Sequence, residues 1–470
     1  MTDLSTYSSA CDQVAAVRSG EVSARELLEL HLVRIAEVNP RVNAVVSLDE
    51  ERARASAAEA DERQARGEEL GALHGLPWAF KDTHDVAGWR TTYGSPLLAD
   101  NVPEEDEEVV ARVRRAGAVV LGRTNVPEFA AGSHTFNRVF GTTYNPYDLT
   151  RSAGGSSGGA AAGLASGMLP LADGSDMGGS LRNPASFCNV VGLRPSLGRV
   201  PRWPSDNAWE TTSVSGPLGR TVEDVALLLS VMAGPHPRVS TTSETPGSAF
   251  APPLAGSLAG VRVALSPDLG GAFAVEPEVA AVVEAAGAVF TDGGATVTSA
   301  HPVLEEAEDT FRTLRAWVFW QVYGDLLAQH PDGFKESLAG NIRAGQGVTG
   351  DDVWRAYTQR TGLENRMTAF FADHDVLVMP VSQVPPFPAD EEFPAVVDGV
   401  EMASYLDWMR AAYFVSVTGC PAISVPGGFT PDGLPVGIQV VAPPRGERRL
   451  LEVARAFERA TGYGEQRPVL

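Results

Sequence analysis

The chain has 470 residues, 44% of them hydrophobic, with 37 lysines and arginines against 59 acidic side chains and a formal net charge of −22 at pH 7. It is long enough for one large domain, and its negative charge argues against a nucleic acid partner, because binding phosphates requires clustered lysine and arginine. The three cysteines are widely separated and no apolar run reaches the roughly 18 residues of a membrane span, which argues against a disulfide framework and against a transmembrane segment.

The first part of the chain alternates between predicted helices and strands. Neither the basic patch nor the apolar core of a signal peptide is visible at the start, so we expect a cytoplasmic protein. Ser23-Ala-Arg-Glu26 is a capping box, which predicts the start of a helix. A strand is expected over 42–48, a solvated helix over 50–67, and a helix over 109–117 that leads into a strand over 118–121.

Lys81 is one of only two lysines in a chain whose other basic residues are arginine or histidine. A lysine that loses solvation can give up its proton near neutral pH, whereas arginine cannot, so Lys81 is a candidate general base. The apolar run over 77–80 predicts a short buried strand that delivers this lysine to an interior edge. The alternative is an ordinary ion pair between Lys81 and Asp82 or another carboxylate. The second lysine, Lys335, lies in a polar turn and is expected to be solvated.

Serines and glycines are concentrated between Ser152 and Arg199. Small residues let backbone N–H groups approach a ligand closely, and the turn Asp-Met-Gly-Gly-Ser over 176–180 is the best candidate for stabilising an oxyanion. The residues over 160–172 are too apolar for a flexible linker and predict a buried helix followed by a strand. We therefore interpret this segment as a site of chemistry.

Three other motifs compete for the same segment, and each lacks a necessary part. Residues 155–159 fit the G-x-S-x-G nucleophile elbow with Ser157 as nucleophile, but a turn-rich loop over 145–153 stands where the elbow needs a buried strand. A phosphate-binding loop needs a following Gly-Lys-Ser/Thr, which is absent. A pair of the S-x-x-K type needs a serine three residues before a lysine, and neither lysine has one.

The second half of the chain continues the alternation. A helix is expected over 276–286 and a strand over 295–298, and the pattern as a whole predicts an α/β sheet covered by helices on both faces. The stretch over about 261–400 is expected to build a helical cap and the walls of a substrate site. No Cys–His cluster has the spacing of metal ligands, so we expect neither a metal nor another cofactor.

Two motifs of the serine segment resemble those of the amidase signature hydrolases. The first is G-G-S-S-G-G over 154–159, and the second is D-M-G-G-S-L-R-N-P over 176–184. Stand-alone bacterial members, such as nylon-oligomer hydrolases, aryl acylamidases and urethanases, are the most similar type. Further segments similar to the family, in the family's order, lie over 75–82, 122–129, 141–146, 192–196, 216–226, 419–426 and 433–439.

The resemblance implies the fold and the extent of the domain. We expect the amidase signature fold, with a mixed central β-sheet covered by helices on both faces. A single domain would cover 1–470, with its core over about 70–230 and 410–465 and a more variable helical cap and substrate region over about 235–400.

The resemblance also implies a Ser-cisSer-Lys triad. Ser180 matches the acyl nucleophile, Ser156 the bridging serine with a cis peptide, and Lys81 the base. A serine hydroxyl becomes nucleophilic when an adjacent base takes its proton, and a neutral Lys81 could do so through Ser156. The oxyanion would be held by backbone N–H groups in the turn before and at the nucleophile, those of Met177, Gly178, Gly179 and Ser180.

Other residues match supporting positions of the family. Ser157, Asp176 and Arg182 match positions that brace the serine loops, although each could equally be a local, satisfied polar group. The segment over 131–135 resembles the lining of the acyl-binding side, through Gly132, Ser133 and His134.

Two functions remain open from the sequence. The first is an amide hydrolase for small aryl, alkyl or oligoamide substrates, with carbamates and esters accessible to the same acyl-enzyme chemistry. The second is the glutamine-hydrolysing component of a tRNA-dependent amidotransferase, which releases ammonia for a partner; the lack of a basic cluster argues against it. A non-catalytic protein is disfavoured because all three triad residues are present. A small amide is the expected ligand, and a homodimer is compatible with the sequence.

Overall fold

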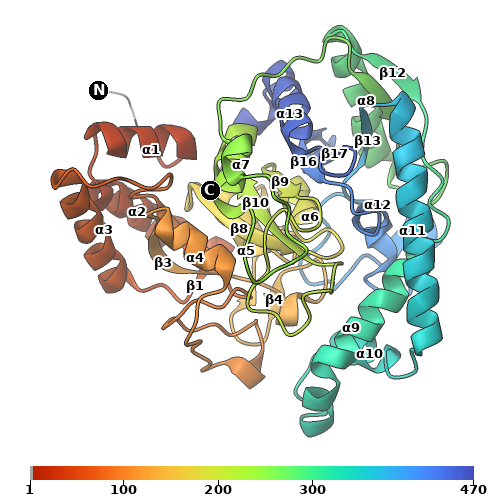
Figure 1. Cartoon of the computed structure of the whole chain (residues 1–470), viewed down its shortest axis with the longest axis horizontal. Coiled ribbons are helices and arrows are strands. Elements are labelled where there is room, and N and C mark those ends of the chain that lie inside the picture. The colour runs from red at the N-terminus through yellow and green to blue at the C-terminus, as the bar shows by residue number, and fades with distance from the viewer. Residues whose placement is uncertain (1–3) are drawn as a thin grey trace.

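A mixed eight-stranded sheet forms the centre of the molecule in a computed structural model that describes residues 4–470 (Figure 1). One strand, Arg262–Leu265, pairs in parallel with both of its neighbours, and the other neighbouring strands pair antiparallel. From one edge to the other the order is β12 (Thr296–Ser299), β11 (Arg262–Leu265), β13 (Val376–Pro380), β17 (Pro435–Val441), β16 (Ala422–Phe429), β9 (Val191–Arg194), β10 (Val214–Gly219) and β8 (Leu171–Asp176).

A second, three-stranded sheet is built from the N-terminal part of the chain. β2 (Pro77–Lys81) pairs in parallel with β3 (Val119–Thr124), and β1 (Val45–Val46) pairs antiparallel with the other edge of β3. This sheet places Lys81 at the end of β2, where its backbone N–H donates to Asp173 of β8. Three small hairpins complete the strands: β4 (Phe136–Asn137) with β5 (Gly141–Thr142), β6 (Tyr144–Asn145) with β7 (Asp148–Ser152), and β14 (Val396–Val397) with β15 (Val400–Glu401).

Helices surround the central sheet and extend beyond both of its ends. In Figure 1 the N-terminal helices α1–α3 lie at one end of the molecule and α9–α11 at the opposite end. Their bounds are α1 (Ala10–Ser19), α2 (Ala24–Val42), α3 (Glu50–Ala65), α4 (Glu108–Arg115), α5 (Gly158–Ala165), α6 (Arg182–Phe187), α7 (Val222–Met232), α8 (Pro277–Asp292), α9 (Ala307–Gln329), α10 (Glu336–Ala344), α11 (Gly350–Asp373), α12 (Arg410–Ser416) and α13 (Glu447–Thr461).

The core follows from alternation of side chains along the strands. In β13, Val376 and Val378 face a cluster that includes α7, α8 and α13, whereas Leu377 and Met379 face a cluster that includes α9, α11 and α12. Successive side chains of a strand point to opposite faces, so a strand that is apolar throughout must be covered on both sides. The helix-covered α/β sheet expected from the sequence is confirmed.

Most of the local predictions agree with the structure. The capping box is present: Ser23 Oγ accepts the N–H of Glu26, whose carboxylate accepts the N–H of Ser23. The helix predicted over 50–67 is α3, the pair over 109–121 is α4 with β3, and the pair over 276–298 is α8 with β12. The strand expected over 42–48 is only two residues long, β1, because α2 continues to Val42 and because Asn43 and Ser47 have left-handed backbone conformations, with φ of 54° and 51°.

The region over 235–400 does more than cap the site. It contains α8–α11, as a helical cap requires, but it also contributes β11, β12 and β13 to the central sheet. All five side chains of β13 are buried, which gives these residues a place inside the sheet. Within residues 4–470, no helix is both long enough and apolar enough to cross a membrane.

Candidate active site

Lys81 projects from the end of a strand whose five side chains are all buried. Its Nζ contacts three hydroxyl oxygens, Ser156 Oγ at 2.7 Å and Ser157 Oγ and Ser175 Oγ at 2.9 Å each. Ser156 and Ser157 belong to the loop before α5, and Ser175 belongs to β8. Three separate segments of the chain therefore meet at the Lys81 side-chain nitrogen.

The Lys81 side chain has no carboxylate partner among residues 4–470. The neighbouring Asp82, the partner that a simple ion pair would require, instead accepts hydrogen bonds from Arg123 at 3.3 Å and from Thr92 Oγ1 at 2.5 Å. Burial lowers the pKa of Lys81 to about 7, against the opposing effects of the Asp173 and Asp176 charges. At neutral pH a large fraction of this lysine is therefore uncharged, which a general base requires.

The loop that carries Ser156 is held from both sides. The Gly155–Ser156 peptide is cis, as the resemblance implied. Ser133 Oγ donates to the carbonyl of Gly155 at 2.7 Å, and Thr135 Oγ1 donates to the carbonyl of Gly154 at 2.8 Å. A Cβ on Gly155 would lie 3.0 Å from Thr135 Oγ1, so the close approach of the two segments favours glycine there.

The segment over 131–135 holds the loop over 154–157, through the bonds of Ser133 and Thr135 to that loop. Ser133 also accepts a hydrogen bond from Asn183 Nδ2 at 3.0 Å. His134 uses both ring nitrogens inside the protein, Nδ1 with Ser152 Oγ at 2.7 Å and Nε2 with the carbonyl of Ala389 at 3.1 Å. Burial lowers the pKa of His134 to about 4, so the ring is neutral at physiological pH.

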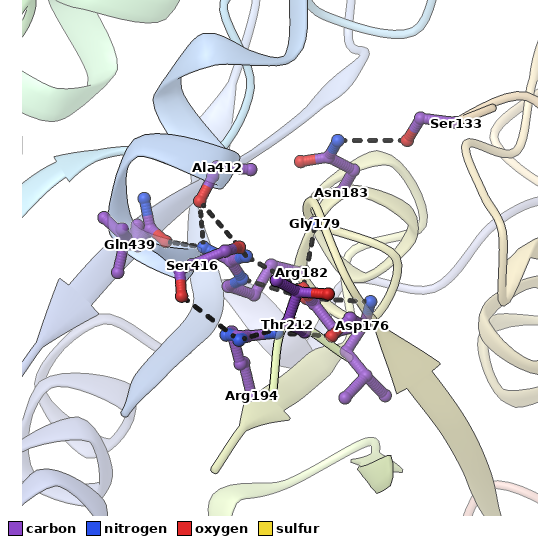
Figure 2. Close-up of polar contacts among 12 residues, drawn as sticks. Ser133, Asp176, Gly179, Arg182, Asn183, Arg194, Thr212, Ala412, Ser416 and Gln439 are labelled. Atoms are coloured by element: carbon purple, nitrogen blue, oxygen red, sulfur yellow. Dashed lines mark hydrogen bonds and ion pairs between the residues drawn. The ribbon is translucent and has the colours of Figure 1, made fainter. Parts of the chain in front are cut away.

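Asp176 is the centre of a buried polar cluster, which includes Arg182 and Arg194 and which we call the Asp176 cage (Figure 2). Its carboxylate accepts the backbone N–H of Gly179 at 2.9 Å and of Leu181 at 3.2 Å. Arg182 contributes Nη2 at 2.9 Å and Nε at 3.0 Å, and Arg194 contributes Nη1 at 3.1 Å. Burial opposes ionisation, but Arg182 and Arg194 hold the pKa of Asp176 well below its usual range.

The arginines extend this cage to the C-terminal part of the chain. Arg182 donates from Nη1 to Gln439 Oε1 and to the carbonyl of Ala412, and from Nη2 to Ser416 Oγ (Figure 2). Arg194 donates to the carbonyls of Thr212 and Ser416. Every one of these groups is buried, so the turn before Ser180 is fixed by contacts with β17, α12 and the loop before β10.

Ser180 lies at the surface of this cage and is only 7% exposed. Its carbonyl accepts the N–H of Ser157 at 3.2 Å, which joins the two serine loops. The hydroxyl of Ser180 has no hydrogen-bond partner among residues 4–470. The Gly179 N–H donates to Asp176, whereas the N–H groups of Gly178 and Ser180 have no acceptor in the described chain.

Aromatic side chains flank the turn. A Cβ on Gly178 would lie 2.8 Å from Phe311 Cζ and 3.5 Å from Tyr413 Cβ. The Phe311 and Tyr413 rings are stacked, with centroids 4.3 Å apart. Met177 packs against a second apolar cluster, which includes Phe129 of the short 3₁₀ helix η2 (Glu128–Ala130) and side chains of α9 and α10. Apolar groups therefore border the turn that leads to Ser180.

Two residues differ from what the sequence led us to expect, Lys335 and Ser175. Lys335, expected to be solvated, is only 13% exposed: its Nζ pairs with Glu392 at 3.1 Å and lies 4.8 Å from the centre of the Phe136 ring. The sequence around Lys335, with Asp332 before it and Glu336 and Ser337 after it, gave no sign of these distant partners. Ser175 had not been singled out as a site residue; its place one residue before Asp176, at the end of a strand, was the available signal.

No group of three or more His, Cys, Asp or Glu side chains in the described chain has an arrangement suited to a metal ion.

Comparisons with known proteins identify the family. The family model described as Amidase matches residues 26–451. An acylamidase of Rhodococcus erythropolis is 38% identical over 464 residues, 98% of this chain and 97% of that protein. The A component of the glutamyl-tRNA(Gln) amidotransferase of Synechococcus sp. (strain CC9605) is 37% identical over 477 residues, 96% of each protein. A solved structure of a bacterial aryl acylamidase from the amidase signature family is 30% identical, with a TM-score of 0.91 that covers 98% of this chain and 99% of that one. The chain therefore belongs to the amidase signature family.

Proposed function

We propose that this protein hydrolyses the C–N bond of small aryl or alkyl amides through an acyl-enzyme on Ser180. One observation carries the proposal: a buried lysine without a carboxylate partner, Lys81, is within 2.7 Å of the hydroxyl of Ser156. The apolar groups beside Ser180 favour aryl or alkyl substituents, and the similarity to an acylamidase and an aryl acylamidase agrees with this substrate class.

The reaction begins with proton transfer along the three side chains. Neutral Lys81 accepts the proton of Ser156, and Ser156 accepts that of Ser180 as Ser180 Oγ bonds to the amide carbon. The carbonyl electron pair moves to the oxygen, and the free N–H groups of Gly178 and Ser180 stabilise the resulting negative charge. Because its own N–H already donates to Asp176, Gly179 has a shaping role in this scheme, and Asp176, Arg182 and Ser157 are structural supports.

The tetrahedral intermediate then collapses. The electron pair of the oxygen reforms the carbonyl, the C–N bond breaks, and the proton held by Lys81 returns through Ser156 to the departing amine nitrogen. Water adds to the ester on Ser180 by the same proton path, releases the carboxylic acid and restores the serine. An aryl carbamate or an ester presents the same acyl carbon, so we include both in the proposed substrate range.

The test is hydrolysis of a panel of substrates by the purified protein. The substrates are p-nitroanilides, simple aliphatic amides, an aryl carbamate and glutamine, and each is assayed with the wild type, Ser180→Ala and Lys81→Ala. Ser166→Ala is the matched control, because Ser166 is a buried serine that donates to the carbonyl of Ala162 away from the site. We expect anilide cleavage by wild type and by Ser166→Ala only. Undiminished activity of Ser180→Ala would refute the proposed nucleophile.

The aryl carbamate also tests the covalent step. Displacement of the phenol leaves a carbamoyl group on the nucleophile, and intact-protein mass spectrometry followed by peptide mapping should place that group on Ser180. Lys81→Ala should acquire it far more slowly, because the hydroxyl then has no base. A carbamoyl group on Ser156 or Ser157 instead would assign the nucleophile differently.

A second function is favoured by one specific observation, the 37% identity to the A component of an amidotransferase over 96% of both chains. Such a protein would use the same acyl-enzyme chemistry on glutamine and pass ammonia to a partner. If glutamine alone is cleaved, or if cleavage requires added partner proteins, this second function replaces the first.

A further inference from the structure

A second buried polar cluster contacts the backbone of Lys81 and is not used in the chemistry proposed above. Its centre is Asp173, a fully buried residue of β8. Asp173 Oδ2 accepts the backbone N–H of Lys81 at 3.1 Å, and Oδ1 accepts the indole N–H of Trp78 at 2.9 Å. A buried negative charge this close to a lysine favours the protonated ammonium, which is the wrong state for a general base.

His84 lies between this carboxylate and a second one. Its Nδ1 is 2.8 Å from Glu107 Oε2, and its Nε2 is 3.6 Å from Asp173 Oδ2. The side chain of His84 is 4% exposed, that of Asp173 is completely buried, and that of Glu107 is 26% exposed. The three groups therefore form a row that begins near solvent at Glu107 and ends at Asp173 beside Lys81.

We propose that His84 is a positioning residue of the reaction: its imidazolium, placed between Glu107 and Asp173, offsets the charge of Asp173 and so allows Lys81 to act as a neutral base. The inference rests on the proposed role of Lys81 as base. His84 does not touch the reacting atoms; it acts only through the charge that Lys81 experiences.

The surroundings of the ring support a charged imidazole. Burial opposes ionisation, but Glu107 and then Asp173 raise the pKa of His84 above its usual value, and Lys81 acts against them. Burial likewise opposes ionisation of Glu107, yet His84 lowers the pKa of that carboxyl. The charged groups around His84 and Lys81 come from several elements. Lys81 belongs to β2, Arg123 to β3, Asp173 and Asp176 to β8, and Glu107 directly precedes α4. The loop after β2 contributes Asp85 and also Asp82, which pairs with Arg123.

The experiment measures kcat/KM for a p-nitroanilide as a function of pH. In the wild type the acid limb reports the loss of neutral Lys81. His84→Gln removes the compensating positive charge, so we expect the limb to move up by about 1 pH unit, a loss of about tenfold at pH 6. Asp173→Asn removes the negative charge and should move the limb in the opposite direction. The double variant should return toward the wild-type profile.

Two further variants make the result specific. His31→Gln is the matched control, because His31 is a buried histidine bonded to Gln13 and to the carbonyl of Met168, and it should keep the wild-type profile. Glu107→Gln acts at the partly exposed end of the row; with its carboxylate lost, the imidazolium is less stable, so the limb should move in the same direction as in His84→Gln.

The outcomes separate this inference from the proposed function. If the acid limbs of His84→Gln and Glu107→Gln coincide with that of the wild type while Lys81→Ala is inactive, the role of His84 is refuted and Lys81 remains the base. If Lys81→Ala keeps its activity, the proposed function itself fails. A purely structural role for His84 would lower the melting temperature and kcat/KM at every pH without moving the limb, and that result would also overturn the inference.

Discussion

Replacing Asp176 by asparagine keeps the shape of the side chain but removes the charge at the centre of the cage in Figure 2. Two buried guanidinium groups, those of Arg182 and Arg194, would then lose their only carboxylate partner among residues 4–470. Breaking a buried pair on one side costs about 3–5 kcal/mol, because the remaining charge is left uncompensated. We expect a loss of stability of that size.

The corresponding shift in melting temperature follows from the size of the chain. The entropy of unfolding is about 2.1 cal/mol/K per residue, or about 1 kcal/mol/K for 470 residues. The melting temperature should therefore fall by about 3–5 °C. Because the folded pKa of Asp176 lies below its ordinary value, this stability is fully present above about pH 4 and is lost only as the pH falls through the folded pKa.

The value of kcat/KM should fall as well, because Asp176 accepts hydrogen bonds from the N–H groups of Gly179 and Leu181, on either side of Ser180. A misplacement of about 1 Å at a reacting group can cost on the order of 100-fold in rate. Differential scanning calorimetry and kcat/KM for a p-nitroanilide are the two measurements. Asp309→Asn is the matched control: its pair with Arg355 is half-exposed at 3.8 Å, so it should cost less than about 1 kcal/mol. If Asp176→Asn and Asp309→Asn have the same melting temperature and Asp176→Asn keeps its activity, the cage does not shape the turn.

Three further changes test other parts of the structure. Lys81→Arg keeps the positive charge but cannot release a proton, so no anilide hydrolysis is expected at any pH. In the wild type, kcat/KM should fall about tenfold per pH unit below about pH 7. Measuring kcat/KM of both proteins over a pH series tests this expectation, and activity of Lys81→Arg would contradict it. Gly179→Ala would place a Cβ 2.6 Å from Ala412 Cβ at a φ of +121°, so we expect a loss of at least about 1–3 kcal/mol together with activity, and an unchanged melting curve would contradict the packing argument. Ser23→Ala removes the capping box of α2 and should cost about 1 kcal/mol with no change in kcat/KM; a fall in kcat/KM would link α2 to the site.

The elements that could be predicted from sequence are those specified by nearby residues. The start of α2 is fixed by Ser23 and Glu26, three positions apart, and β2 is marked by a short apolar run. The meeting of Lys81 with Ser156 and Ser175 has no such local signal, because these residues are 75 and 94 positions apart. Only the resemblance of the motifs to a family brought Lys81 and Ser156 together in advance, and the contact with Ser175 was not predicted.

Burial of polar residues was the least predictable feature. Lys335 lies in the sequence between Asp332 and Glu336, yet its partner Glu392 is 57 positions away. His84 lies three positions after Lys81, and no sequence pattern there predicts its contacts with Glu107 and Asp173. A buried charge requires a partner that only the tertiary fold supplies, so its environment follows from topology rather than from the neighbouring residues.

The cage around Asp176 makes the turn at Ser180 depend on residues near the end of the chain, which are synthesised last. Lys81, Ser156 and Ser180 are all made in the first half of the chain, but Arg182 is secured by Ala412, Ser416 and Gln439. A growing chain that already contains every proposed catalytic residue therefore still lacks the contacts that set the turn at Ser180. The proposed hydrolytic site is therefore complete only when β17, near the C-terminus, is in place in the central sheet.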